Sequence, residues 1–447
     1  MDPLTHGIAG ALMAKAFFTN VGAGLQARPD GKPSEDQPLR PAMTDAGRSK
    51  DRPLPTGEPP DKRAAPLTNH ESRITVLIVT LGAVFPDADF VFNLFSQSRV
   101  ATLEYHRWIT HSVVCLPVFA LGLAAATWWW LRRRYGAQRV APLRRLAGMY
   151  AAGIASHILL DAVTSWGTQV WAPVTRARAN WDWVFILDVT LTAILLLPQL
   201  AAWLLREPER AAARAMSWWA GMSLGLAGLR TAATVVGVDF SWTLVALGSA
   251  LLGGVLWAAV RRSRAEGAAP RGDAGSVARV ERRWCRAGVV AATAYLALCA
   301  AAHELALGRV RRFVAAHGVA AESVGALPLP PLASRWAGLV RTREGVHLAL
   351  FDLLEARPAR FEFTADTAPP ELLESARELP EVQTYFWFAR FPVMRLEERD
   401  GRRVLVFNDL RFPRRWSSAP APFEYEVRFD ANGKVTAHGW APLADAE

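Results

Sequence analysis

Two ionisable residues, His157 and Asp161, lie inside the apolar stretch 153–167. Four residues apart on a helix, their side chains point the same way, one turn above the other. An imidazole and a carboxylate at this spacing are suitable metal ligands, as in helical zinc motifs. Because ionisable groups inside a membrane segment are costly and rare, they are usually functional. The pair therefore predicts one wall of a metal site.

Further candidate ligands occur in three other short stretches of the N-terminal half. They are His6, Asp87, His106 and His111. Residues five apart do not share a helix face, so His111 is favoured over His106 unless the chain bends between them. Neutral imidazole nitrogen and carboxylate oxygen suit Zn²⁺, and a carboxylate-rich site also admits Mn²⁺ or Fe²⁺. These residues are enough for one divalent ion and up to three.

Such a site has a definite chemistry. Metal ions can activate water and hold the attacking and leaving oxygens of a phosphoryl displacement. In this hypothesis Asp89 is a spare carboxylate that acts as the base, Arg107 stabilises phosphate charge, and Thr110 or Ser112 orients a ligand. Two alternatives stay open. A single buried histidine can serve as a hydrogen-bond donor in helix packing, and Asp89 could equally cap a helix or support a ligand.

Apolar segments must position these ligands. Hydrophobic residues make up 51% of the 447 residues, and many of the 18 Trp residues end apolar runs, as in an interfacial aromatic belt. Apolar segments of about 20 residues, long enough to cross a bilayer, are expected at 4–25, 74–95, 112–131, 146–166, 183–205, 213–236, 239–260 and 287–307. We therefore expect an all-α polytopic membrane domain of about seven or eight helices.

The net charge of +10 could indicate nucleic acid or anionic lipid as a partner. Lys and Arg fall mainly in loops between apolar segments, at 132–145, 206–214 and 261–286. This is the positive-inside pattern of a membrane protein, so no nucleic-acid partner is expected. Alternation of the segments puts the three loops on one side, predicted to be the cytoplasm. The candidate ligands then gather at the opposite, extracytoplasmic ends of the helices.

The composition changes twice along the chain. Residues 26–72 are rich in Pro, Gly and charged residues with few aliphatic ones, which predicts a disordered insertion. Beyond residue 308, short alternating runs and the turn Asp430–Gly433 predict a small α+β domain, mostly antiparallel and extracytoplasmic. The expected divisions are a membrane-embedded metal domain at 1–205, further transmembrane helices at 206–308 and a soluble domain at 309–447. Strands are expected at 346–351, 359–363, 404–407 and 425–429, and a helix at 371–378.

The candidate residues resemble the motifs of the YdjM/YbcI-type inner-membrane metal-dependent hydrolases. The matching stretches are Thr5-His6, Pro86-Asp87-Ala88-Asp89, His106-Arg107-Trp108-Ile109-Thr110-His111-Ser112 and Ser156-His157 to Asp161. The resemblance covers about 1–25 and 73–200, and the later segments look like longer bacterial members. It implies the helical fold of the zinc-dependent phospholipase C and P1-type nucleases. By fold analogy alone, it also implies a phosphoester or phospholipid substrate.

Two functions of different classes remain open. The first is a multi-pass, bacterial inner-membrane hydrolase that cleaves a phosphoester of a lipid or envelope component with metal-activated water, zinc being the first choice. The second is a non-catalytic, metal-stabilised scaffold or regulator that binds a protein partner through its C-terminal domain. A scaffold predicts complete coordination of the metal, whereas catalysis needs an open position. A transporter would spread polar residues through the bilayer, but here they gather at one end.

Overall fold

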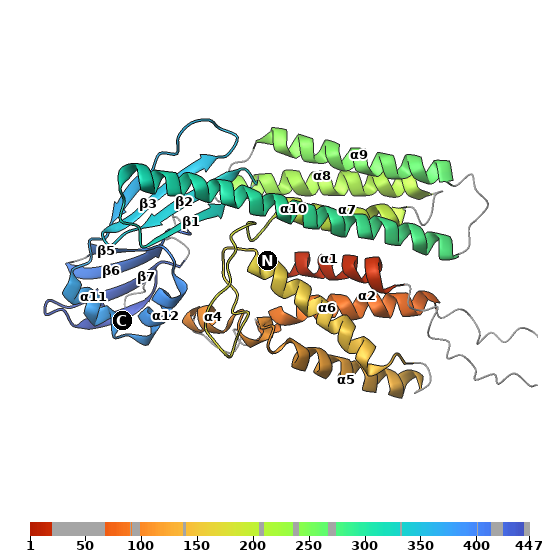
Figure 1. The fold of residues 1–447 in the computed structure, drawn as a ribbon, viewed down its shortest axis with the longest axis horizontal. Helices are drawn as coiled ribbons and strands as arrows, with labels where there is room; N and C mark the ends of the chain where they lie inside the picture. Colours follow the sequence, from red (N-terminus) through yellow and green to blue (C-terminus); the bar gives the residue numbers. More distant parts are fainter. Residues whose placement is uncertain are drawn as a thin grey trace, which may run out of the picture.

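The computed structural model describes residues 1–19, 68–89, 91, 99–136, 140–204, 210–235, 241–266, 274–330, 333–399, 401–412 and 423–441. Long helices lie side by side, and a β-rich domain is attached at one end of them (Figure 1). The insertion predicted at 26–72 lies outside the described residues, apart from 68–72, which begin a helix. Residues 20–25 of the first apolar segment also lie outside them.

The N-terminal half is a bundle of helices. Its long helices are α1 (Pro3–Met13), α2 (Thr68–Val84), α5 (Leu116–Tyr135), α6 (Leu143–Ala162) and α7 (Val189–Leu204). Shorter pieces are η1 (Ala14–Phe18), η4 (Phe85–Asp89), α4 (Arg99–Tyr105) and η5 (Ile109–His111). Helix α6 packs between α2 and α5, and α1 packs against α2 and α7. This packing brings α1, η4 and η5, which carry candidate ligands, into contact with α6.

Three further helices follow, α8 (Ala211–Val235), α9 (Trp242–Glu266) and α10 (Ala274–His317). Helices α8 and α9 pack on each other, and α10 packs along α7. Helix α10 has 44 residues and runs through the boundary expected near residue 308. Its far end packs against the first strands of the C-terminal domain. One continuous helix therefore joins the bundle to that domain.

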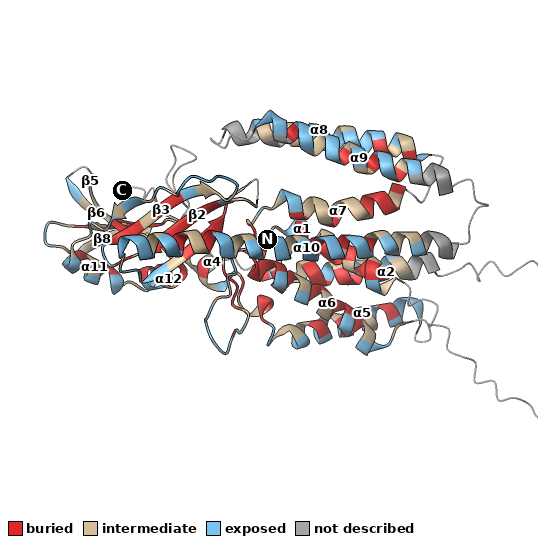
Figure 2. Cartoon of the chain, turned by 45° about the horizontal axis from the view of Figure 1, so that its top comes forward, coloured by how far each residue is buried: buried red, intermediate tan, exposed pale blue. Residues whose placement is uncertain are grey.

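The helix surfaces carry many exposed apolar side chains, for example Leu224, Leu251 and Val290 (Figure 2). Among the described residues, one helix, Ala278–His317, is long and apolar enough to cross a membrane. A second span is added if Thr102–His111 and Leu116–Tyr135, which meet at 70°, form one broken span. The apolar segments from residue 112 onwards do form helices, as expected. How many of them cross a bilayer stays a prediction.

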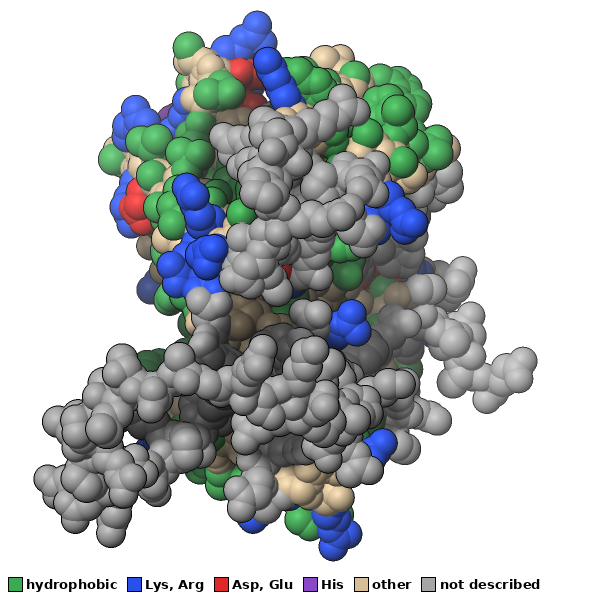
Figure 3. Space-filling model, turned by 90° about the vertical axis from the view of Figure 1, so that its right-hand side faces the viewer, with side chains coloured by type: hydrophobic (Ala, Val, Ile, Leu, Met, Phe, Trp, Pro, Cys, Tyr) green, Lys and Arg blue, Asp and Glu red, His purple; other side chains and the backbone are tan. Residues whose placement is uncertain are grey.

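The basic residues gather at one end of the bundle. Arg132 to Arg134 end α5, Arg144 and Arg145 begin α6, and Arg279 to Arg286 lie near the start of α10. These helix ends point away from the β-rich domain, and Lys and Arg side chains are visible on that face (Figure 3). The basic loops therefore share one end, as expected. Which side of a membrane this end faces stays a prediction.

The C-terminal domain contains two four-stranded antiparallel sheets, each with its strands in sequence order. The first sheet has β1 (Ser323–Pro328), β2 (Arg335–Arg341), β3 (Gly345–Asp352) and β4 (Glu362–Ala365). The second has β5 (Pro392–Arg399), β6 (Arg402–Asp409), β7 (Tyr425–Phe429) and β8 (Val435–Trp440). Two short helices, α11 (Pro370–Arg377) and α12 (Pro380–Phe388), lie between the sheets in sequence. The antiparallel α+β prediction is confirmed.

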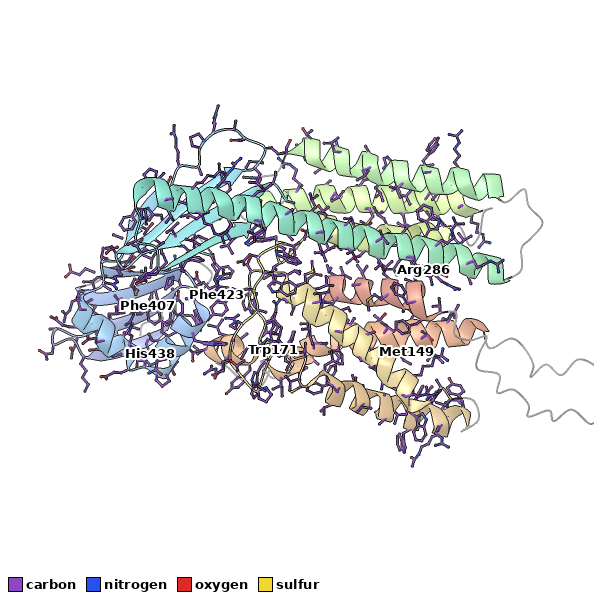
Figure 4. All side chains as sticks on the ribbon, viewed as in Figure 1. Met149, Trp171, Arg286, Phe407, Phe423 and His438 are labelled. Carbon is purple, nitrogen blue, oxygen red and sulfur yellow. The ribbon has the colours of Figure 1, made fainter. Side chains whose placement is uncertain are left out.

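The loop between α6 and α7 lies between the bundle and the C-terminal domain, as the position of Trp171 illustrates (Figure 4). The C-terminal domain is tied to this loop by polar contacts. Arg411 Nη1 donates to the Ser165 carbonyl at 3.1 Å, and Trp387 Nε1 donates to the Arg176 carbonyl at 3.3 Å. The domain is therefore docked against the end of the bundle that holds the candidate ligands.

Candidate metal centre

The close packing of α2 against α6 positions the first ligand. A Cβ atom on Gly153 would lie 2.4 Å from the Val79 carbonyl oxygen, and one on Gly82 would lie 2.9 Å from the Tyr150 carbonyl oxygen. Only glycine permits such a close approach of two backbones. One turn beyond Gly153, His157 Nδ1 lies 2.7 Å from the Ala83 carbonyl oxygen at the end of α2. Nδ1 therefore donates, which leaves the Nε2 lone pair of His157 available to a metal.

Two carboxylate oxygens lie close to the Nε2 atoms of two neighbouring histidines, which gives four candidate donor atoms. They are Asp87 Oδ1, His111 Nε2, His157 Nε2 and Asp161 Oδ2. The five of their mutual distances that connect a histidine to another donor range from 3.0 to 3.6 Å. Ligands about 2.0–2.1 Å from a tetrahedral zinc ion lie roughly 3.3–3.5 Å apart. Asp87, His111 and His157 therefore fit three of the donors of a tetrahedral divalent ion, and Asp161 lies beside both histidines.

Burial supports the same interpretation. His111, His157 and Asp161 are fully buried, and only Asp87 is slightly exposed. The second carboxylate oxygen of Asp87 and Oδ2 of Asp161 are buried without a hydrogen-bond partner among the described residues. Buried carboxylate oxygens are normally satisfied by donors or by cations. A bound cation would satisfy the Asp87 oxygen, whereas Asp161 Oδ2 already lies 3.0 Å from Arg107 Nε.

His6 supplies a second set of donors. Its ring stacks on that of His157 with centroids 3.6 Å apart, and its Nε2 lies 3.2 Å from Asp161 Oδ1. His6, His157 and Asp161 form a second group whose ligand atoms lie within 4.8 Å of one another. The α-amino group of Met1 also contacts Asp161 Oδ1. This second ligand group shares His157 with the group of Asp87, His111 and His157. The structure therefore brings together five of the six ligands predicted from the sequence.

Asp89 and His106 lie next to these groups but belong to neither. Asp89 Oδ2 accepts from the Arg107 backbone N–H at 2.9 Å and from Thr110 Oγ1 at 3.3 Å, and its Oδ1 lies 3.1 Å from His106 Nδ1. Thr110 Oγ1 in turn lies 3.0 Å from His111 Nδ1. Such contacts hold a ligating imidazole so that its other nitrogen faces the metal. Metal binding by His106 and base catalysis by Asp89 stay predictions.

Arg107 places a buried positive charge beside Asp161. Its Nε lies 3.0 Å from Asp161 Oδ2, and its Nη1 donates to Thr164 Oγ1 at 3.2 Å. The backbone of Arg107 has a φ of 63°, in the left-handed region that non-glycine residues rarely adopt. Strain of this kind concentrates at functional sites, where surrounding contacts hold it in place. Here the bond to Asp89 holds the backbone while the side chain reaches Asp161.

Two further acidic residues at the start of the apolar segment 183–205 have structural contacts instead. Asp182 pairs with Arg390 at 2.9 Å, so it links the bundle to the C-terminal domain. Asp188 Oδ1 accepts from the Leu191 N–H at 2.8 Å and thus caps α7, while its Oδ2 accepts from the Tyr295 hydroxyl at 2.8 Å. Neither residue is a member of the two ligand groups.

A sequence match to a serine nucleophile motif also proves to be structural. Gly221-Met-Ser-Leu-Gly225 has the Gly-x-Ser-x-Gly pattern, which in hydrolases forms a sharp turn between a strand and a helix. Here the motif lies inside α8, and Ser223 Oγ lies 2.7 Å from Ser249 Oγ of α9. The motif therefore contributes to helix packing.

If Asp89 acts by orienting His111, replacing it should weaken metal binding rather than remove only a catalytic step. We expect Asp89→Asn to lower zinc affinity by about 10- to 100-fold, the usual effect of losing a residue that orients a ligand. Competition with a chromogenic chelator measures this affinity. Asp188→Asn, which changes an acid outside both groups, should leave it unchanged. Unaltered affinity in Asp89→Asn would refute the orienting role and return Asp89 to the role of base.

Comparison with known proteins gives a family match for the central part of the chain. No curated protein and no solved structure matches the chain. Residues 61–237 match the family model described as YdjM inner membrane protein. This range contains the candidate ligands Asp87, His111, His157 and Asp161. The resemblance seen in the motifs is thus confirmed over residues 61–237.

Proposed function

We propose that this protein is a membrane-bound, metal-dependent hydrolase that cleaves a phosphoester of a lipid or envelope component. The proposal is carried by the two buried ligand groups that share His157, one with Asp87 and His111 and the other with His6 and Asp161. The donor set is nitrogen and oxygen only, which suits Zn²⁺ first and Mn²⁺ or Fe²⁺ next. His6 adds a donor for a second ion, which phosphoryl-transfer sites often use.

An apolar pocket beside the ligands favours a lipid substrate. The pocket has a volume of about 400 Å³ and is lined by Leu81, Val84, Phe85 and Leu123 among others, with Asp87 at its edge. Leu81 is about half exposed, so the pocket opens on the apolar outer surface of the bundle. An acyl chain could occupy this pocket while the phosphoester lies at Asp87. The lipid would then reach the site without leaving the membrane.

The residues of the site have separate tasks in this proposal. When bound, a divalent ion polarises a phosphoryl oxygen and lowers the pKa of water. His111 and His157 direct Nε2 toward the ligand groups, because their Nδ1 atoms face Thr110 and the Ala83 carbonyl. Asp87 Oδ2 has no hydrogen-bond partner among the described residues, so it can accept a proton from water.

Arg107 is the charge-stabilising group of the site. Asp161 and Thr164 hold its guanidinium in place beside the ligands. Fixed positive charge next to a phosphoryl group stabilises the negative charge that grows there during transfer. Because Arg107 is buried, this charge acts in a medium that screens it less than water does.

The test is turnover of defined phospholipids by the full chain reconstituted in lipid. We expect hydrolysis that stops on chelation and returns on adding zinc. Asp87→Asn should lower the rate about 100-fold or more, because it removes both a ligand charge and the proposed proton acceptor. Asp352→Asn, in the C-terminal domain, is the control and should behave as wild type. Full metal occupancy without turnover of any phosphoester offered would contradict the proposal and favour the non-catalytic scaffold.

A further inference from the structure

A second pocket, rich in arginine, lies between the α6–α7 loop and the C-terminal domain. It has a volume of about 240 Å³. Its lining includes Arg176 and Arg178 from the loop, Arg390 and Arg411 from the domain, and the rings of Trp166 and Trp387. No Asp or Glu is among the residues that line it. The pocket therefore presents four guanidinium groups and no carboxylate.

Three of the four arginines have a carboxylate partner outside the pocket. Arg176 pairs with Glu104 at 2.8 Å, Arg390 with Asp182 at 2.9 Å and Arg411 with Asp409 at 2.7 Å. Arg178 differs, because its Nη2 donates only to the carbonyl oxygens of Trp166 and Gly167, at 2.6 and 3.1 Å. No ion pair of Arg178 with a carboxylate occurs among the described residues. Its positive charge is therefore not balanced by an adjacent acid.

Aromatic rings hold these guanidinium groups in place. Arg176 and Arg178 lie over the Trp387 ring at 4.7 and 4.9 Å, and Arg178 and Arg411 lie over the Phe388 ring, each at 4.6 Å. Stacking fixes a guanidinium plane and leaves its N–H edge free to bind an oxyanion. Burial, together with the charges of Arg411 and Arg107, lowers the pKa of Arg178 to about 9. An anion in the pocket would relieve this repulsion.

Trp166 connects this pocket to the metal centre. Its ring lies 5.9 Å from the Arg107 guanidinium on one side and 5.2 Å from the Phe388 ring on the other. Two of the residues around the pocket, Asp182 and Phe423, also have a φ near 60°, and Phe423 packs on Trp166 at 5.3 Å. Strained residues held by tertiary contacts tend to occur at binding sites. The pocket is therefore held by tertiary contacts and adjoins the candidate metal centre.

We propose that the arginine pocket binds a phosphate group of the substrate or product of the metal centre. A phosphate is negatively charged, and two of its oxygens can accept hydrogen bonds from one guanidinium group while the others face a second. Assignment of the ligand as substrate or product rests on the proposed hydrolase function. Binding of phosphate to the pocket does not depend on that function, and it can be measured without turnover.

The experiment is calorimetric titration of the full chain in detergent with inorganic phosphate and, separately, with a short-chain phosphatidic acid. Each titration is made on the protein as purified and after chelation of metal. We expect binding in both states, weakened about 10-fold or more by Arg178→Gln and several-fold by Arg176→Gln. Arg176 is exposed, so its variant tests the pocket even if Arg178→Gln folds poorly. Arg343→Gln removes an exposed arginine elsewhere in the domain and should bind as wild type.

The outcomes are separable. Binding of both ligands supports a site for free phosphate, and binding of phosphatidic acid alone supports a site for a lipid headgroup. Binding of neither ligand, or an equal loss in Arg343→Gln, would overturn the pocket. If phosphate binds through Arg178 but no phosphoester is hydrolysed, the proposed function fails and the anion site stands.

Discussion

Asp161→Asn is expected to lower the affinity for zinc by about 100-fold and to abolish metal-dependent turnover. A structural zinc site contributes roughly 10–16 kcal/mol over four ligands, so losing one anionic ligand removes about a quarter of that. Asp161 is fully buried and contacts His6, His111, His157 and Arg107. It belongs to the ligand group of His6 and His157, and its Oδ2 also lies 3.3 Å from His111 Nε2. The substitution keeps the shape of the side chain but removes its charge.

The matched control is Asp182→Asn. Asp182 is also a buried acid in an ion pair with arginine, but it lies outside both ligand groups. Both variants leave a partly buried arginine without its acid, which costs about 3–5 kcal/mol when the pair is fully buried. Only Asp161→Asn should lose zinc. If both variants retain zinc with wild-type affinity, Asp161 is not a ligand.

Gly153→Ala is expected to destabilise the fold by about 3 kcal/mol or more, because overpacking of two helices forces their backbones apart. The new methyl group would lie 2.4 Å from the Val79 carbonyl oxygen and 2.7 Å from the Ala83 amide nitrogen. Neither atom can move without displacing α2. Since His157 bonds the Ala83 carbonyl, separating the helices would also disturb the ligand set. Thermal unfolding and zinc content of the same preparations measure the two effects.

Gly148→Ala provides the control on the same helix. A Cβ atom at Gly148 would have no neighbour within 4 Å. Alanine favours a helix over glycine by about 1 kcal/mol, so this variant should be as stable as wild type or more so. The unfolding temperature should fall for Gly153→Ala and stay unchanged or rise for Gly148→Ala. Equal effects at Gly148 and Gly153 would contradict close packing of α6 on α2.

Local spacing was enough to predict much of the metal centre. His157 and Asp161 lie one turn apart on a helix, and that relation needs no tertiary information. The positions of Asp87, His111 and His6 at the same ends of apolar segments predicted their convergence. The antiparallel C-terminal domain followed from alternating runs and from the turn Asp430–Gly433. The hairpin there forms as expected, with Gly433 at a φ of 82°.

Other features depend on contacts between distant segments, so spacing could not reveal them. The tight α2–α6 contact is marked in the sequence only by glycines, which also occur at open positions such as Gly148. The arginine pocket combines residues near 176 with others near 390 and 411, which the fold alone brings together. Strands β1, β2 and β5 were not expected. Helix α10 continues to His317, although the polar residues beyond 308 indicated the start of a new domain.

The central claim is that Asp87, His111, His157 and Asp161 bind one divalent ion. X-ray absorption spectroscopy of the zinc-loaded protein in detergent tests it most directly. The account predicts one zinc or more per chain, nitrogen and oxygen ligands at about 2.0–2.1 Å, and outer scattering from at least two imidazoles. A sulfur shell at about 2.3 Å would assign the metal to cysteine and contradict the account. So would a protein that holds no zinc after loading.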